Sequence, residues 1–318
     1  MNDTSWRKHR RWLCVFLSAL ALAWTVALLW RAWPELRANL PRMHAGWLLV
    51  ALVGNVISGY LGFEAFRALF RLMKPEAYGR LHLAHLYFTA QLMKHLPGRV
   101  WGVAYQSSTG DRASLAEWVS ITVAYMVLTT CFAVWVAAIV LGFMRAIGWG
   151  WFASILGLSI YLMGWHRRVL NALFALFRKL PGRAFNRLGD ALLPFVNVET
   201  NYKMRVLVLF AANWLVYLVS WAGYGLAWPD LTATDGIQLC AIYTVAWLVG
   251  YLSLVSPSGV GVRELVFVLL AHRFPTDVVA GLAVFGRVAL LASDVLLGML
   301  FSPFRPARIK STDMHGNR

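Results

Sequence analysis

Long uninterrupted apolar runs are the feature that most restricts what this chain can fold into. Each of them holds at least the ~20 residues that an α-helix needs to cross a bilayer. The runs are Gly46–Phe66, Trp118–Phe143, Val206–Trp228 and Val278–Phe301. They are continuous, whereas the strands of a membrane β-barrel alternate apolar and polar residues. Charged residues make up only 14% of the chain. We therefore predict an all-α polytopic membrane helical bundle that forms a single integral membrane domain over residues 1–318.

Two other apolar segments are interrupted by helix-breaking residues. Leu81–Leu96 is short for a span and breaks at Pro97 and Gly98, and Ile237–Ala271 breaks near Pro257. Proline removes a backbone donor, and glycine relaxes the helix further. Irregular backbone at membrane depth is tolerated only where protein or a water-filled cavity satisfies it. Broken helices of this kind are typical of transporter binding sites. The alternative is a cytoplasmic turn between two ordinary spans.

Charged residues stand beside both breaks and inside the last apolar run. Such charges are costly in lipid, at about 2.5–3.5 kcal/mol each near the bilayer centre. The predicted substrate-binding residues are Pro97, Gly98, Arg99, Pro257, Ser258, Gly259, Gly261, Arg263, Glu264, Arg287 and Asp294. Glu264 would hold Arg263 in place or take a proton during transport, or else it braces a tight turn. Arg287 and Asp294, at i and i+7, share one helix face that should point into the bundle, and structural pairing and a substrate path both stay open.

The distribution of basic residues predicts the orientation of the chain. Arg7–Arg11, the Arg67–Arg80 loop, the Trp165–Lys203 loop and the C-terminal tail are basic, whereas Pro229–Gly236 is acidic. Basic loops stay in the cytoplasm. If the segment before Pro97 crossed the membrane fully, the most basic loop would face outside. We therefore expect that segment to enter and return, with both termini on the cytoplasmic side of a bacterial inner membrane.

This topology gives two halves with the same order of elements and opposite orientation. Residues 12–147 and residues 148–304 would each contain two spans, a re-entrant broken helix and a further span. The first span of each half would be Leu13–Trp30 and the shorter Trp149–Gly164. That is an inverted-topology repeat. The tips of the two hairpins would meet near the midplane, where helix N-termini bind anions such as phosphate. If the second broken segment instead crosses twice, the chain ends stay on the same side.

Two short motifs carry a resemblance to a known family. The motifs are PSGVGVRE at Pro257–Glu264 and LPGRVW at Leu96–Trp101. Both resemble signatures of the flippase-like integral membrane family that includes the transmembrane region of lysylphosphatidylglycerol synthases. Ser258 stands where many members carry glycine, and the polar run that often follows the first proline is replaced here by Arg99-Val100-Trp101. The resemblance implies a helical membrane fold and lipid translocation. We expect no aminoacyl-transferring domain in this sequence.

These features predict a lipid translocase rather than an enzyme. It would move an anionic phospholipid or a lipid-linked envelope intermediate between leaflets, without a metal or cofactor. One alternative is a non-transporting scaffold that partners an envelope glycosyltransferase or lipid-modifying enzyme, and another is a small-solute secondary transporter. The net charge of +16 is concentrated in loops, where it attracts anionic headgroups rather than nucleic acid. No nucleotide-binding motif and no paired carboxylates or nucleophile–base set are visible. The sequence does not define an oligomeric state.

Overall fold

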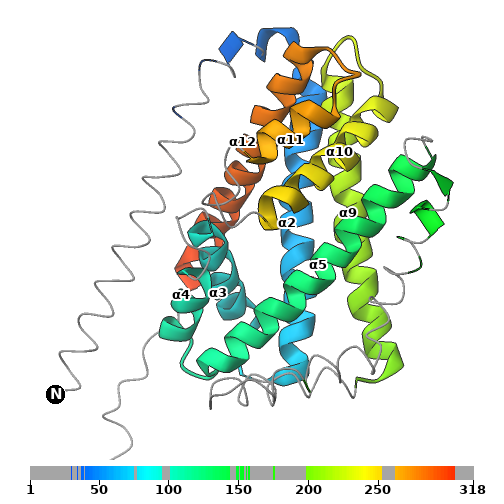
Figure 1. Cartoon of the computed structure of the whole chain (residues 1–318). Coiled ribbons are helices and arrows are strands. Elements are labelled where there is room, and N and C mark those ends of the chain that lie inside the picture. The colour runs from blue at the N-terminus through cyan, green and yellow to red at the C-terminus, as the bar shows by residue number, and fades with distance from the viewer. Residues whose placement is uncertain are drawn as a thin grey trace, which may run out of the picture.

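A computed structural model of the protein describes residues 40–74, 77–94, 101–143, 198–252 and 262–304, with isolated positions elsewhere. These residues are almost entirely helical (Figure 1). The α-helices are α2 (Ala45–Met73), α3 (Arg80–Met93), α4 (Trp101–Thr109), α5 (Leu115–Phe143), α9 (Thr200–Ala227), α10 (Ala233–Leu252), α11 (Val262–Leu270) and α12 (Thr276–Phe301). Short 3₁₀ turns cover Leu40–Arg42 and Ser302–Phe304. The N-terminal basic run and nearly all of the long basic loop lie outside the described residues. The same holds, apart from isolated positions, for the predicted spans Leu13–Trp30 and Trp149–Gly164.

Four of these helices are long and apolar enough to cross a membrane. They are α2, α5, α9 and α12, and they correspond to the four apolar runs of the sequence. The prediction of a helical membrane protein is therefore confirmed. The helices extend beyond the predicted runs, most of all α2, which continues to Met73, and α9, which begins at Thr200 inside the predicted loop. At 29 residues, α2 is about 43 Å long and exceeds the ~30 Å hydrocarbon core.

Exposed apolar side chains form stripes along several of the long helices. On α9, Met204, Val208, Leu215 and Val219 are each more than half exposed. Similar stripes run along α2 and the end of α12. A water-soluble protein rarely leaves such large contiguous apolar areas uncovered. Lipid acyl chains would cover these faces in a membrane.

The centre of the bundle is an antiparallel pair formed by α2 and α9 (Figure 1). The amide of His44, at the start of α2, donates to the carbonyl of Ala227, at the end of α9, over 2.8 Å. Halfway along the pair, the Ser58 hydroxyl donates to Asn213 Oδ1 at 2.8 Å. At the other end, the Tyr202 hydroxyl donates to the carbonyl of Ala68 at 2.7 Å. Hydrogen bonds at both ends and in the middle thus fix the register of α2 and α9.

Two pairs of shorter helices pack against this centre from opposite ends of the molecule (Figure 1). In one pair α3 packs on α4, and in the other α10 packs on α11. The Arg112 amide, just after α4, donates to the Tyr78 hydroxyl, just before α3, so α3 begins where α4 ends. Two helices, α5 and α10, begin with a capping box, in which a hydroxyl residue and an acidic residue three positions later bond each other's backbone amides. The residues are Ser114 and Glu117 for α5 and Thr232 and Asp235 for α10.

Candidate functional site

The last helix, α12, carries two charged side chains that each pair with a different helix. Arg287 Nη1 donates to Glu264 Oε1 of α11 at 3.1 Å. Asp294 Oδ2 accepts from Lys94 Nζ, at the end of α3, at 2.8 Å. The Asp294 side chain is 15% exposed, and those of Arg287 and Glu264 are 26% and 28% exposed. The two residues share a face of α12, as their spacing predicted, but each makes its ion pair with another helix.

These ion pairs connect α12 to the flanks of both broken segments. Lys94 lies shortly before Pro97, and Glu264 lies in the first turn of α11, shortly after Pro257. Seven residues of helix separate the two attachment points on α12, a rise of about 10 Å. The other predicted site residues lie outside the described part of the chain: Pro97, Gly98, Arg99, Pro257, Ser258, Gly259 and Gly261. The described flanks of both breaks therefore contact the same helix, α12.

Arg263 and Glu264 each contact a different helix. Glu264 forms an ion pair with Arg287 of α12. That Glu264 holds Arg263 in place, takes a proton during transport or braces a turn stays a prediction. The Arg263 guanidinium lies over the ring of Tyr243, 5.9 Å from its centroid, which is a cation–π contact. Its buried Nε has no hydrogen-bond partner among the described residues. Neighbouring residues on a helix point in different directions, and so the two charges of this dipeptide face different helices.

A group of polar side chains lies in the bundle beside Asp294. The hydroxyls of Tyr87 and Tyr125 are 3.1 Å apart, and both rings lie within electrostatic range of the Asp294 carboxylate. A Cβ atom on Gly62 would lie 3.0 Å from the Tyr125 hydroxyl, so glycine makes room for these hydroxyls. The Ser58–Asn213 hydrogen bond lies on the same side of α2. The sequence did not single out these residues, because they come from four different helices.

His85 joins the first pair of short helices to the end of α12. Its ring nitrogens lie 3.1 Å from the Phe301 carbonyl and 3.0 Å from the Tyr105 hydroxyl. His82 lies on the same helix, edge-on to the ring of Tyr78. Within the described residues, no group of three His, Cys, Asp or Glu side chains is arranged to hold a metal ion.

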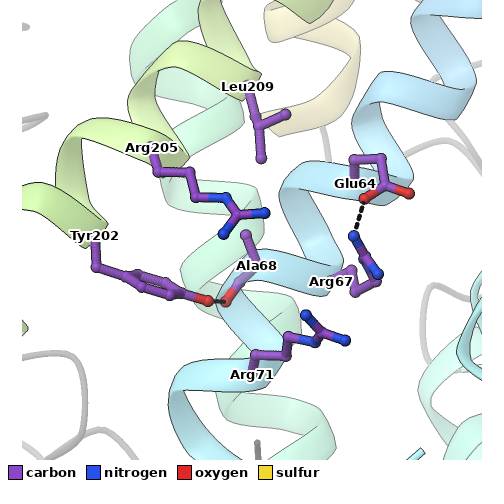
Figure 2. Close-up of a pocket in the computed structure, with 7 residues that line it drawn as sticks. All are labelled: Glu64, Arg67, Ala68, Arg71, Tyr202, Arg205 and Leu209. Carbon is purple, nitrogen blue, oxygen red and sulfur yellow. Dashed lines mark hydrogen bonds and ion pairs between the residues drawn. The ribbon is translucent and has the colours of Figure 1, made fainter. Parts of the chain in front are cut away.

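A cavity of about 540 Å³ opens between α2 and α9 (Figure 2). Its lining combines guanidinium groups from both helices with one carboxylate and one phenol: Glu64, Arg67, Ala68, Arg71, Tyr202, Arg205 and Leu209. The three guanidinium groups face the same space (Figure 2). Glu64 pairs with Arg67 at 2.6 Å, the i,i+3 pair visible in the sequence, and also with Arg80 of α3 at 2.8 Å. The hydrogen bond from Arg80 to Glu64 raises the pKa of the Arg80 guanidinium.

The sequence contains a periodic signal for this cavity. Glu64, Arg67 and Arg71 stand at i, i+3 and i+7, and Tyr202 and Arg205 begin the same spacing on α9. Each set therefore occupies one helix face. What sequence reasoning missed is that these two faces lie against each other, because nothing in the local pattern says which helices are neighbours.

Comparisons with known proteins give no match to a family model, a curated protein or a solved structure. The resemblance of the two Pro/Gly motifs to the flippase-like family therefore stays a prediction.

Proposed function

We propose that this protein moves an anionic phospholipid or a lipid-linked envelope intermediate between the leaflets of a bacterial inner membrane. The observation that carries the proposal is the pair of charged attachments on α12. The flanks of both broken segments reach one helix inside the bundle through Glu264–Arg287 and Lys94–Asp294. Charges within a membrane bundle are costly, so they are typical of substrate and ion pathways. The guanidinium groups of Arg263 and Arg287 would attract the anionic headgroup of the lipid.

The pattern of helix contacts supports the proposed inverted repeat. If α2, α3, α4 and α5 correspond to α9, α10, α11 and α12, most contacts have a counterpart. The contact of α3 with α12 matches that of α10 with α5, and α3–α4 matches α10–α11. Likewise α4–α5 matches α11–α12, and α2–α12 matches α9–α5. The correspondence exchanges α2 with α9, so the contact between them is its own counterpart. This is expected for two helices related by a pseudo-two-fold axis in the membrane plane.

Helix lengths support the proposal that the broken segments are re-entrant. α3 has 14 residues and is about 21 Å long, and α4 and α11 have nine each and are about 13 Å long. All three are shorter than the ~30 Å hydrocarbon core. At 20 residues, α10 is about 30 Å long and could cross. In the proposed orientation, the basic end of α2 and the start of α9 face the cytoplasm, and the Pro229–Gly236 turn faces outward.

Two alternatives lead to different expectations for the same charges. A non-transporting scaffold for an envelope glycosyltransferase or lipid-modifying enzyme needs no charges inside the bundle, so the two ion pairs favour transport over this role. A small-solute transporter would use a closed polar pocket. The lining of the described cavity is partly exposed and borders lipid-facing side chains of α9, which favours a lipid. Without a nucleotide-binding motif, transport would be downhill or coupled to an ion gradient.

Reconstitution tests the proposal directly. Proteoliposomes with fluorescent phosphatidylglycerol in both leaflets are treated with a membrane-impermeant quencher, next to protein-free liposomes and liposomes with fluorescent phosphatidylcholine. Translocation should expose nearly all of the anionic probe, whereas protein-free vesicles protect the inner half. If the inner half of the phosphatidylglycerol probe stayed protected in proteoliposomes as it does in protein-free vesicles, transport of this lipid class would be contradicted. Equal quenching of the phosphatidylglycerol and phosphatidylcholine probes would indicate scrambling without headgroup selection.

A further inference from the structure

The arginine cavity between α2 and α9 shares no lining residue with the two ion pairs of α12 that carry the function proposed above. We propose that it binds the phosphate of an anionic lipid headgroup at one membrane surface. This inference concerns binding only and does not depend on whether the protein transports lipid.

The geometry places three cationic groups around one space. Arg67 and Arg71 come from α2 and Arg205 comes from α9, and the two helices run antiparallel, so their faces remain opposed over two turns (Figure 2). All three guanidinium groups lie within electrostatic range of Tyr202. The Tyr202 hydroxyl is held by the Ala68 carbonyl at 2.7 Å, which ties the two walls together. The site is therefore built on rigid helices.

The charge balance of the cavity favours an anion. Its single carboxylate, Glu64, is already shared by Arg67 and Arg80. Within the described part of the chain, neither Arg71 nor Arg205 forms an ion pair with a carboxylate. Guanidinium groups offer a planar fork of donors that matches two phosphate oxygens at once. A phosphate at this position would complete the coordination of the two arginines.

The surroundings of the cavity favour a lipid over a soluble phosphate compound. Arg71 lies two residues before the end of α2, and Arg205 lies in the second turn of α9, so both are near the headgroup level of a spanning helix. Met204 and Val208, beside Arg205, are 56% and 57% exposed and belong to the apolar stripe of α9. Acyl chains would lie along this stripe while the phosphate enters the cavity. The volume of about 540 Å³ is in the range of small-molecule sites, about 300–1,000 Å³.

Binding of short-chain lipids to the purified full-length protein tests this proposal. The probes are dioctanoyl phosphatidylglycerol, dioctanoyl phosphatidylcholine and inorganic phosphate, with affinity measured by thermophoresis in a neutral detergent. The test variant is R71Q/R205Q, which removes the two cations that have no ion pair in the described residues. The control variant K74Q/K203Q removes two positive charges at the same end of α2 and α9, outside the cavity lining. A thermal melt of each variant reports on its folding.

The expected result is at least about a tenfold weaker affinity of R71Q/R205Q for phosphatidylglycerol, because two charge-assisted contacts are lost. The control should bind like the wild type, and phosphatidylcholine should bind more weakly throughout. Equal losses in test and control variants would overturn the proposal, since binding would then reflect surface charge alone. If inorganic phosphate bound as tightly as the lipid, the lipid assignment would be wrong. If the double variant does not fold, the affinities of the single variants R205Q and K203Q for phosphatidylglycerol are compared in the same way.

Discussion

Lys94, at the end of α3, forms a 2.8 Å ion pair with Asp294 of α12, the last helix of the chain. This ion pair joins the helix before the first break to the helix that also carries Arg287. Because Arg287 binds Glu264 at the start of α11, a single helix holds the flanks of both breaks.

Removing the Lys94 charge should destabilise the protein more than removing a lysine whose carboxylate partner is more exposed. In K94Q, the largely buried Asp294 carboxylate loses this partner, and we expect a loss of about 1–2 kcal/mol, below the value for fully buried pairs because Lys94 is 49% exposed. The measurement is thermal unfolding in detergent. K74Q is the control, because Lys74 pairs with Glu117 over a longer distance of 3.2 Å, and the Glu117 side chain is 24% exposed against 15% for Asp294. This pair should contribute less than about 1 kcal/mol. Equal melting temperatures for both variants would show that the Lys94–Asp294 pair contributes little.

Replacing Glu264 by glutamine should separate a transport role from a bracing role. E264Q keeps the shape of the side chain and a hydrogen bond to Arg287 but loses the charge and the titratable proton. We expect normal insertion and purification, with lipid translocation in proteoliposomes slowed by about tenfold or more. K74Q again serves as the matched ion-pair control. Undiminished translocation would reject the role of Glu264, and loss of translocation together with a lower melting temperature would leave only a structural brace.

Cysteine labelling from the periplasmic side should reveal the proposed orientation. Asp111 lies in the turn between α4 and α5, and Asp230 lies between α9 and α10, and both are exposed. With the native cysteines replaced, D230C should react with a membrane-impermeant maleimide in intact cells. D111C should react only after permeabilisation, and N186C, in the long basic loop, should behave in the same way. If D111C and N186C both reacted in intact cells while D230C did not, the first hairpin would cross the membrane fully.

Alanine at the close approach of α9 and α10 should be strongly destabilising. A methyl group on Gly225 would lie 2.8 Å from the Cα of Gly236, too close for the two backbones to keep their positions. Small residues permit such close helix packing in membranes. We expect G225A to cost about 1–3 kcal/mol in thermal unfolding. Gly46 is the control, because a methyl group there has no atom within 4 Å, and G46A should be neutral or slightly stabilising. A neutral G225A would mean that these helices can separate without cost.

The sequence alone was sufficient to predict the four long helices and the membrane class. Both follow from local properties, since an apolar run of ~20 residues can satisfy its backbone in lipid only as a helix. Two of the predicted runs end at the same residue as the helix observed, Phe143 for α5 and Phe301 for α12. The spacing of Arg287 and Asp294 likewise placed both charges on one face of α12.

Only the tertiary structure decided which residues become partners. Periodicity says which face a side chain occupies, but the neighbouring helix depends on how the whole bundle packs. For this reason the sequence did not predict the ion pair between Glu264 of α11 and Arg287 of α12. For the same reason, Arg71 and Arg205 read as two unrelated basic residues near the ends of helices. The antiparallel packing of α2 on α9 brings them to one cavity, because each side chain points from its own helix toward the other.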